Sequence, residues 1–165
     1  SLAGAVVGYF TNLFPNDPPK FIVMEAQAAD CLYRGALAGD GAPRIVDGDL
    51  QTIMAGLACG EPNTISWDIL RNHVSAFVSC PDWVSARGMR MLGVPVKGDP
   101  VVISGESGAV GMGLLAALME TDVYRDLREA LELDRFSQVL MFSTEGNTDP
   151  MKFRKVLWDG EYPTV

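Results

Sequence analysis

Short apolar runs alternate with helical patterns along this chain, and this alternation limits its possible folds more than any other feature. Three runs, at residues 21–25, 101–103 and 139–142, are apolar at nearly every position and too short for helices. Strands that are apolar on both faces are typical of parallel sheets covered by helices. We therefore expect an α/β fold, a three-layer arrangement with helices on both faces of a parallel sheet.

The residues around these runs carry helical signals. We expect residues 2–14 to form a helix rich in small side chains. The breaker cluster at residues 15–19 would end it. From Thr64, as N-cap, the apolar spacing predicts a helix that continues to residue 78. Further helices are expected at residues 29–37, 81–91, 109–119, 122–133 and 150–158.

The composition excludes several classes of function. The net charge of -8 would repel nucleic-acid phosphates and anionic lipid, so neither nucleic acid nor membrane is an expected partner. No apolar stretch is long enough to span a membrane, and we expect a cytoplasmic protein. Three cysteines without CxxC spacing favour thiols over a disulfide framework, although pairing of Cys31 with Cys59 stays open. With one histidine, His73, neither a His-containing triad nor a metal site is expected.

Two polar, glycine-containing segments follow apolar runs. In residues 104–109 the apolar run passes into a helix whose first N–H groups suit an anion or a polar ring substituent, with Glu106 beside them. The alternative is an ordinary turn in which Ser107 is the N-cap. In residues 142–149, Ser143 comes just past the run, where its hydroxyl could meet a ligand, and Thr148 or Asp149 caps the next helix.

A third segment, residues 52–62, is dense in small side chains. It suits either a tight crossing in the core or the wall of a site, because small residues let backbones approach closely. None of the lysines lies in a context typical of a Schiff-base lysine. They are Lys20, Lys97, Lys152 and Lys155.

Taken together, these segments resemble one family of pyridoxal-phosphate enzymes. The strings DLQTIMAGLACGEP, GMRMLG, ISGESGAVG, FSTEGNTD and VLWDGEYP are similar to the C-terminal portion of the tryptophan synthase β subunit and threonine dehydratase superfamily, and within it to the diaminopropionate ammonia-lyases. The resemblance spans nearly all of the chain. It implies a fold-type II enzyme with pyridoxal 5'-phosphate as cofactor.

The resemblance also assigns roles to individual residues. Ser1 and Leu2 correspond to the end of the glycine-rich loop that binds the cofactor phosphate. Ser143 corresponds to the hydroxyl residue that hydrogen-bonds the pyridine nitrogen, with Thr144 beside it, and Glu106 to a position near the ring. A neutral hydroxyl at that nitrogen deepens the electron sink less than a carboxylate would, which favours elimination over transamination.

The resemblance implies that residues 1–165 are the C-terminal portion of a lyase domain. The Schiff-base lysine would lie in the missing N-terminal part, so the catalytic residues are unknown and this chain is not expected to act alone. The intact protein, expected as a homodimer, would convert the small amino acid 2,3-diaminopropionate to pyruvate and ammonia. A serine or threonine dehydratase is one alternative, although such enzymes usually carry a shorter S-G-G-N-like stretch. A non-catalytic α/β module is the other.

Overall fold

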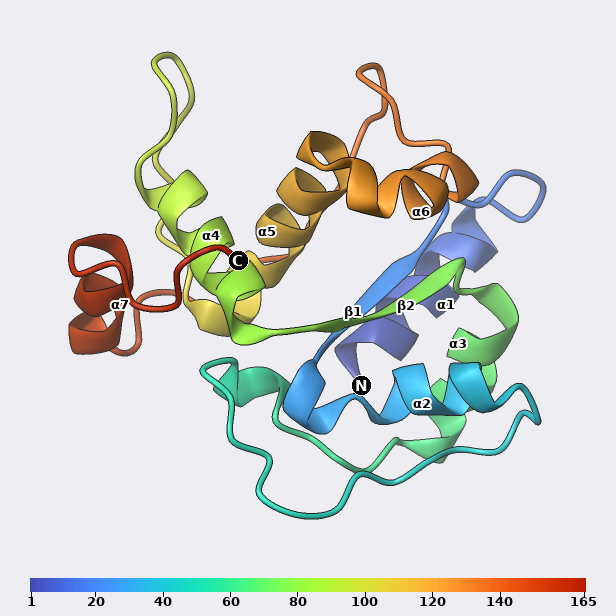
Figure 1. Ribbon diagram of the computed structural model, residues 1–165. Coiled ribbons are helices and arrows are strands. Elements are labelled where there is room, and N and C mark those ends of the chain that lie inside the picture. The colour runs from blue at the N-terminus through green and yellow to red at the C-terminus, as the bar shows by residue number, and fades with distance from the viewer. The chain divides into compact units, whose positions relative to one another are not determined.

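The computed structural model describes all 165 residues, and they form two compact units (Figure 1). Unit 1 contains residues 1–51 and 57–79, and unit 2 contains residues 52–56 and 80–165. None of the helices combines the length and the apolar character that crossing a bilayer requires.

Unit 1 contains the sheet. Strand β1 (Ile22–Ala26) pairs in parallel with β2 (Ala76–Cys80), which ends at the boundary between the units. The helices of the unit are α1 (Leu2–Leu13), α2 (Cys31–Ala38) and α3 (Thr64–His73), with 3-10 turns at Gln27–Ala29 and Ala55–Leu57, the latter shared with unit 2. Its core is a cluster of buried apolar side chains from α1, β1 and α3: Val7, Val23 and Leu70.

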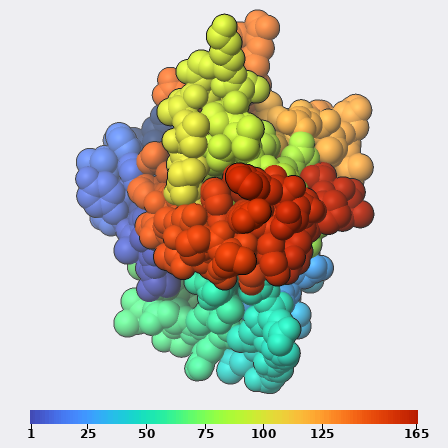
Figure 2. Space-filling view, turned by 90° about the vertical axis from the view of Figure 1, so that its left-hand side faces the viewer, coloured from blue at the N-terminus to red at the C-terminus, as the bar shows by residue number.

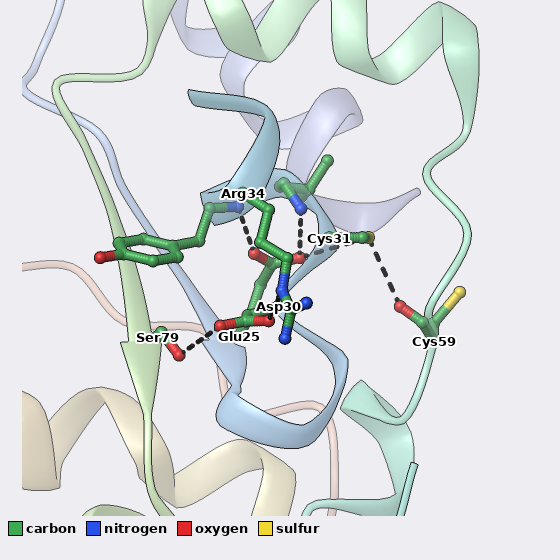
Figure 3. Close-up of polar contacts among 8 residues, drawn as sticks. Glu25, Asp30, Cys31, Arg34, Cys59 and Ser79 are labelled. Atoms are coloured by element: carbon green, nitrogen blue, oxygen red, sulfur yellow. Dashed lines mark hydrogen bonds and ion pairs between the residues drawn. The ribbon is translucent and has the colours of Figure 1, made fainter. Parts of the chain in front are cut away.

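A buried carboxylate fixes the start of α2 (Figure 3). Asp30, the residue before the helix, makes no capping bond to it. Instead, Glu25 on β1 accepts the backbone N–H groups of Leu32 at 3.0 Å and Tyr33 at 2.7 Å. These amides have no partner within the helix, so the carboxylate satisfies two donors that would otherwise be unpaired. Burial raises the pKa of Glu25 in spite of these bonds.

Unit 2 is helical. It consists of α4 (Asp82–Gly93), α5 (Glu106–Glu120), α6 (Arg125–Ala130) and α7 (Pro150–Leu157), with a 3-10 turn at Asp122–Tyr124. Helices α4 and α5 cross at two glycines. A Cβ on Gly88 would run into the carbonyl oxygen of Ala109, and one on Gly113 into that of Val84. Two backbones can approach this closely only where side chains are absent, which explains the density of small residues on α5.

The α/β class is confirmed, while several predicted elements are wrong. Residues 101–103 and 139–142 are apolar as expected, but neither run has a ladder partner, so neither is a strand. The helix expected to reach residue 78 ends at His73. Strand β2 follows, and just before it the backbone N–H of Ser75 donates to the carbonyl of Phe21 at 2.9 Å. Pairing with β1, which the local pattern does not reveal, overrides the helical spacing.

Two of the expected caps are also wrong. Asn63, rather than Thr64, caps α3 by accepting the backbone N–H of Ser66 at 2.9 Å. Gly105, rather than Ser107, precedes α5. The cap of α7 is confirmed, since Asp149 accepts the backbone N–H of Lys152 at 3.0 Å. Residues 122–133 form a 3-10 turn and the short helix α6 instead of one continuous helix.

Candidate functional site

The two segments that follow apolar runs meet in unit 2. The hydroxyl oxygens of Ser104 and Ser143 lie 2.7 Å apart, within hydrogen-bonding distance. One residue further along, the backbone N–H of Gly105 donates to the carbonyl of Glu145 at 2.9 Å. Ser104 is buried, whereas Ser143 is exposed. The pair therefore joins a serine of the exposed loop to a buried serine just before α5.

Gly108, in the first turn of α5, leaves room for this pair. A Cβ at this position would lie 2.6 Å from the Ser104 hydroxyl oxygen and 2.7 Å from that of Ser143. Real Cβ atoms do not approach other atoms so closely, so any larger residue would displace one of the two hydroxyls. Gly108 therefore allows the two serines to pack closely against α5, rather than forming a turn.

A side chain from the second segment caps α5. Glu145 Oε2 accepts the backbone N–H of Ser107 at 2.7 Å, which satisfies one of the unpaired amides at the helix start. The hydroxyl of Ser107 in turn accepts the backbone N–H of Gly56 at 2.9 Å. The small-residue segment, residues 52–62, therefore contributes Gly56 to this region. Two other members of the segment, Ile53 and Met54, are buried, as core packing predicts.

Glu106 lies at the start of α5 and is buried, with 6% of its surface exposed. Burial raises its pKa, and the nearby negative charge of Glu145 adds to the effect, whereas Lys152 opposes it. Ser85 on α4 donates from its hydroxyl to the backbone carbonyl of Glu106 and fixes the residue from the other side. The Glu106 carboxyl group therefore keeps its proton to a higher pH than an exposed glutamate does.

The loop of residues 143–149 and helix α7, which follows it, form a continuous part of the surface of unit 2 (Figure 2, orange to red). Thr144 is exposed beside Ser143 in this loop. The structure therefore brings Glu106, Ser143 and Thr144 into one region. The sequence analysis missed Ser104 and Glu145 as members of it. The signal for Ser104 was available, because both serines directly follow an apolar run.

Ser1 and Leu2, the remaining expected site residues, belong to unit 1. Ser1 is the N-cap of α1, and its hydroxyl accepts the backbone N–H of Gly4 at 3.2 Å. Leu2 is exposed in the first turn. The first backbone amides of a helix lack partners within it and suit an anion such as a phosphate.

The cysteines, lysines and histidine show no catalytic grouping. Cys31 and Cys59 form no disulfide; the thiol sulfur of Cys31 lies 3.5 Å from the carbonyl oxygen of Cys59 and 3.6 Å from Glu25 Oε1 (Figure 3). Burial and the Glu25 carboxylate raise the pKa of Cys31 to about 12.

His73 is exposed, and no group of three or more His, Cys, Asp or Glu side chains is arranged to hold a metal ion. Of the lysines, Lys152 is partly buried and Lys97 is exposed in a loop.

The chain is similar to known enzymes over almost its whole length. It is 49% identical over 161 residues to a diaminopropionate ammonia-lyase of Salmonella typhimurium and 48% identical over 162 residues to that of Escherichia coli. These matches cover 97% and 98% of the chain but 40% of each relative. The chain thus spans about two fifths of the length of the curated relatives it matches. No model of a protein family matches the chain.

Solved structures agree with this relationship. The Escherichia coli diaminopropionate ammonia-lyase, in complex with an aminoacrylate-PLP azomethine reaction intermediate, aligns with a TM-score of 0.86 and 45% identity over 99% of this chain and 40% of that one. A threonine deaminase aligns with a TM-score of 0.58 and 20% identity over 74% of this chain and 40% of that one. The latter likeness shows the fold alone, which is that of the fold-type II enzymes.

Proposed function

The chain is a relative of the diaminopropionate ammonia-lyases, and we propose that the protein it forms part of catalyses the elimination reaction of that family. The reaction would convert 2,3-diaminopropionate to pyruvate and ammonia with pyridoxal 5'-phosphate as cofactor. The 48–49% identity to two such enzymes, spread over nearly all 165 residues, supports this proposal. The residues 1–165 would supply the C-terminal portion of the lyase domain.

The hydroxyl pair of Ser104 and Ser143 is the observation that carries the proposal. A serine hydroxyl can hydrogen-bond a pyridine nitrogen without forcing it to stay protonated, which suits elimination over transamination. If Ser104 donates its proton to Ser143, the Ser143 hydroxyl can donate its own to a ring nitrogen. Gly108 lets both hydroxyls pack against the first turn of α5, which keeps the pair in place.

The resemblance to the family also proposes cofactor contacts for other residues of the chain. The first backbone amides of α1, with Ser1 and Leu2, would bind its phosphate. Glu106 would lie near the ring, where its raised pKa keeps the carboxyl protonated over a wider pH range, and Thr144 would lie beside Ser143 in the cofactor site. When bound, pyridoxal phosphate supplies an electron sink for charge that develops at the substrate Cα.

Covalent attachment of the cofactor is assigned to the part of the protein beyond these residues. Among the lysines of the chain, Lys97 is exposed and Lys155 lies 3.6 Å from Glu161, with which it forms an ion pair at the surface. Lys152 belongs to the first turn of α7.

Substrate turnover by the intact protein tests the proposal. We expect pyruvate and ammonia to form from 2,3-diaminopropionate with a kcat/KM well above those for serine and threonine. Faster turnover of serine or threonine would identify a dehydratase instead. A protein that stays colourless with pyridoxal phosphate and turns over none of the three would be a non-catalytic α/β module.

We further propose a cytoplasmic homodimer as the working form of the intact protein. Both statements follow from the resemblance to the superfamily. Light scattering of the purified intact protein would test the dimer, since a mass equal to that of one chain would contradict it.

A further inference from the structure

We propose that Glu145 is a positioning residue, which holds the Ser143 hydroxyl in the orientation that the cofactor nitrogen requires. The inference rests on the proposed function, since it concerns how the chain would present a hydroxyl to pyridoxal phosphate. It adds a residue that makes no contact with the ring itself.

Glu145 ties the loop to α5 at two points. Its backbone carbonyl accepts the N–H of Gly105 at 2.9 Å, and its Oε2 accepts the N–H of Ser107 at 2.7 Å. Two bonds from one residue to amides two positions apart fix both its location and the direction of the chain that enters it. Ser143, two residues earlier, is thereby held where its hydroxyl meets that of Ser104.

The rest of the loop offers little other support. Ser143, Thr144 and residues 146–148 are exposed, and beyond Glu145 the carbonyl oxygen of Gly146 lies close to Gly105. At the far end, Asp149 fixes the loop only to α7, through its bond to the N–H of Lys152. A loop with so few contacts would sample many conformations without a local clamp. Glu145 is the residue that provides this clamp on the Ser143 side.

The bond to Ser107 depends on reach more than on charge. A carboxylate at a helix start gains from the helix dipole, but Glu106 already places a carboxyl group in the same turn. An uncharged glutamine has the same length and keeps an oxygen that can accept the N–H. An aspartate keeps the charge but is one methylene shorter. We therefore expect Glu145→Gln to preserve the clamp and Glu145→Asp to lose it.

The test is a double-mutant cycle in the intact protein, read out as the dissociation constant for pyridoxal 5'-phosphate. We expect Glu145→Ala and Glu145→Asp to weaken cofactor binding about tenfold, the size of effect that loss of one well-placed hydrogen bond produces. Glu145→Gln should stay within about threefold of the parent. In a Ser143→Ala background, Glu145→Ala should have no further effect, because no hydroxyl remains to be positioned.

A purely structural role for Glu145 would give a different pattern. Equal weakening by Glu145→Ala with and without Ser143 would overturn the proposal, as would unchanged affinity in all Glu145 variants. Glu129→Ala removes the exposed carboxylate of a residue on α6, outside the loop, and should leave the affinity unchanged. Failure of the unsubstituted protein to bind the cofactor would reject the proposed function itself, which separates the two results.

Discussion

At the scale of single residues, the site depends on groups that are small and neutral. Ser104 and Ser143 supply hydroxyls, and the absence of a side chain on Gly108 leaves room for the pair beside α5. The carboxyl groups of Glu106 and Glu145 lie in the same region without hydrogen-bonding to either hydroxyl. This arrangement suits a ring nitrogen that is held by a hydrogen bond rather than by a full charge.

Ser143→Ala tests the hydroxyl itself. Removing the partner of a buried ring nitrogen should cost about 1–3 kcal/mol in cofactor binding or in the barrier to elimination. The measurement is cofactor affinity and kcat of the intact protein with 2,3-diaminopropionate. Thr144→Val, which removes the hydroxyl next in the chain, serves as comparison and should cost less. Parent-like affinity and turnover for Ser143→Ala would reject its role.

Gly108→Ala tests the space beside the pair. The added methyl group would lie within 2.7 Å of both hydroxyl oxygens, so at least one serine must move. We expect cofactor affinity to fall about tenfold or more, by the same loss of a hydrogen bond as in the serine variant. The comparison is Gly146→Ala, whose methyl group would meet no atom within 4 Å. Tight binding by the Gly108 variant would show that the serines are not held as described.

At the scale of elements, the sequence predicted helices better than strands. Helices α1, α4 and α7 were predicted to within about two residues at each end, because their signals, such as Pro150 and the breaker cluster after α1, are local. Strand β2 was missed because its partner β1 lies about fifty residues earlier in the chain. The apolar runs at 101–103 and 139–142 were predicted as strands, and this prediction is wrong, because an apolar run alone does not show whether a pairing partner is present.

The candidate site was predicted in part for the same reason. Ser143 and Glu106 stand at ends of apolar runs, a position that sequence alone reveals. That Glu145 would turn back to cap α5 depends on how two distant segments meet, which no local pattern records.

The crossing of α4 and α5 gives a prediction about stability. Gly113→Ala would place a methyl group against the carbonyl of Val84, and we expect a loss of about 1–3 kcal/mol in the free energy of unfolding, as in other overpacked sites. The matched control is Gly8→Ala in α1, whose methyl group would make only ordinary contacts with Ile69 at 3.9 and 4.0 Å. This control should be neutral or stabilising by up to about 1 kcal/mol. Thermal or urea unfolding of the cofactor-free protein distinguishes the two.

At the scale of the whole molecule, acidity dominates, with a net charge of -8. Two of the carboxyl groups, Glu25 and Glu106, are buried in different units, and burial raises the pKa of each. A carboxyl group with a raised pKa in the folded state binds its proton more tightly there than in the unfolded chain. Its ionisation therefore costs stability as the pH rises.

This linkage predicts a difference between the parent protein and Glu106→Gln. As the pH rises from 4.5, the ordinary pKa of the carboxyl, through the raised value, the parent should lose stability that the variant keeps. Below pH 4.5 the two should show parallel dependence on pH, since the glutamate is then protonated in both states. The melting temperatures of both proteins, measured without cofactor across this range, give the comparison. A constant difference at every pH would contradict the raised pKa.

The central claim is that the Ser143 hydroxyl faces the nitrogen of a bound pyridoxal phosphate ring. A crystal structure of the intact protein with this cofactor measures it directly. The account predicts that the Ser143 Oγ lies about 2.7–3.0 Å from the ring nitrogen, with Ser104 behind it. A ring bound elsewhere, or a Ser143 hydroxyl directed away from it with another group at the nitrogen, would contradict the account.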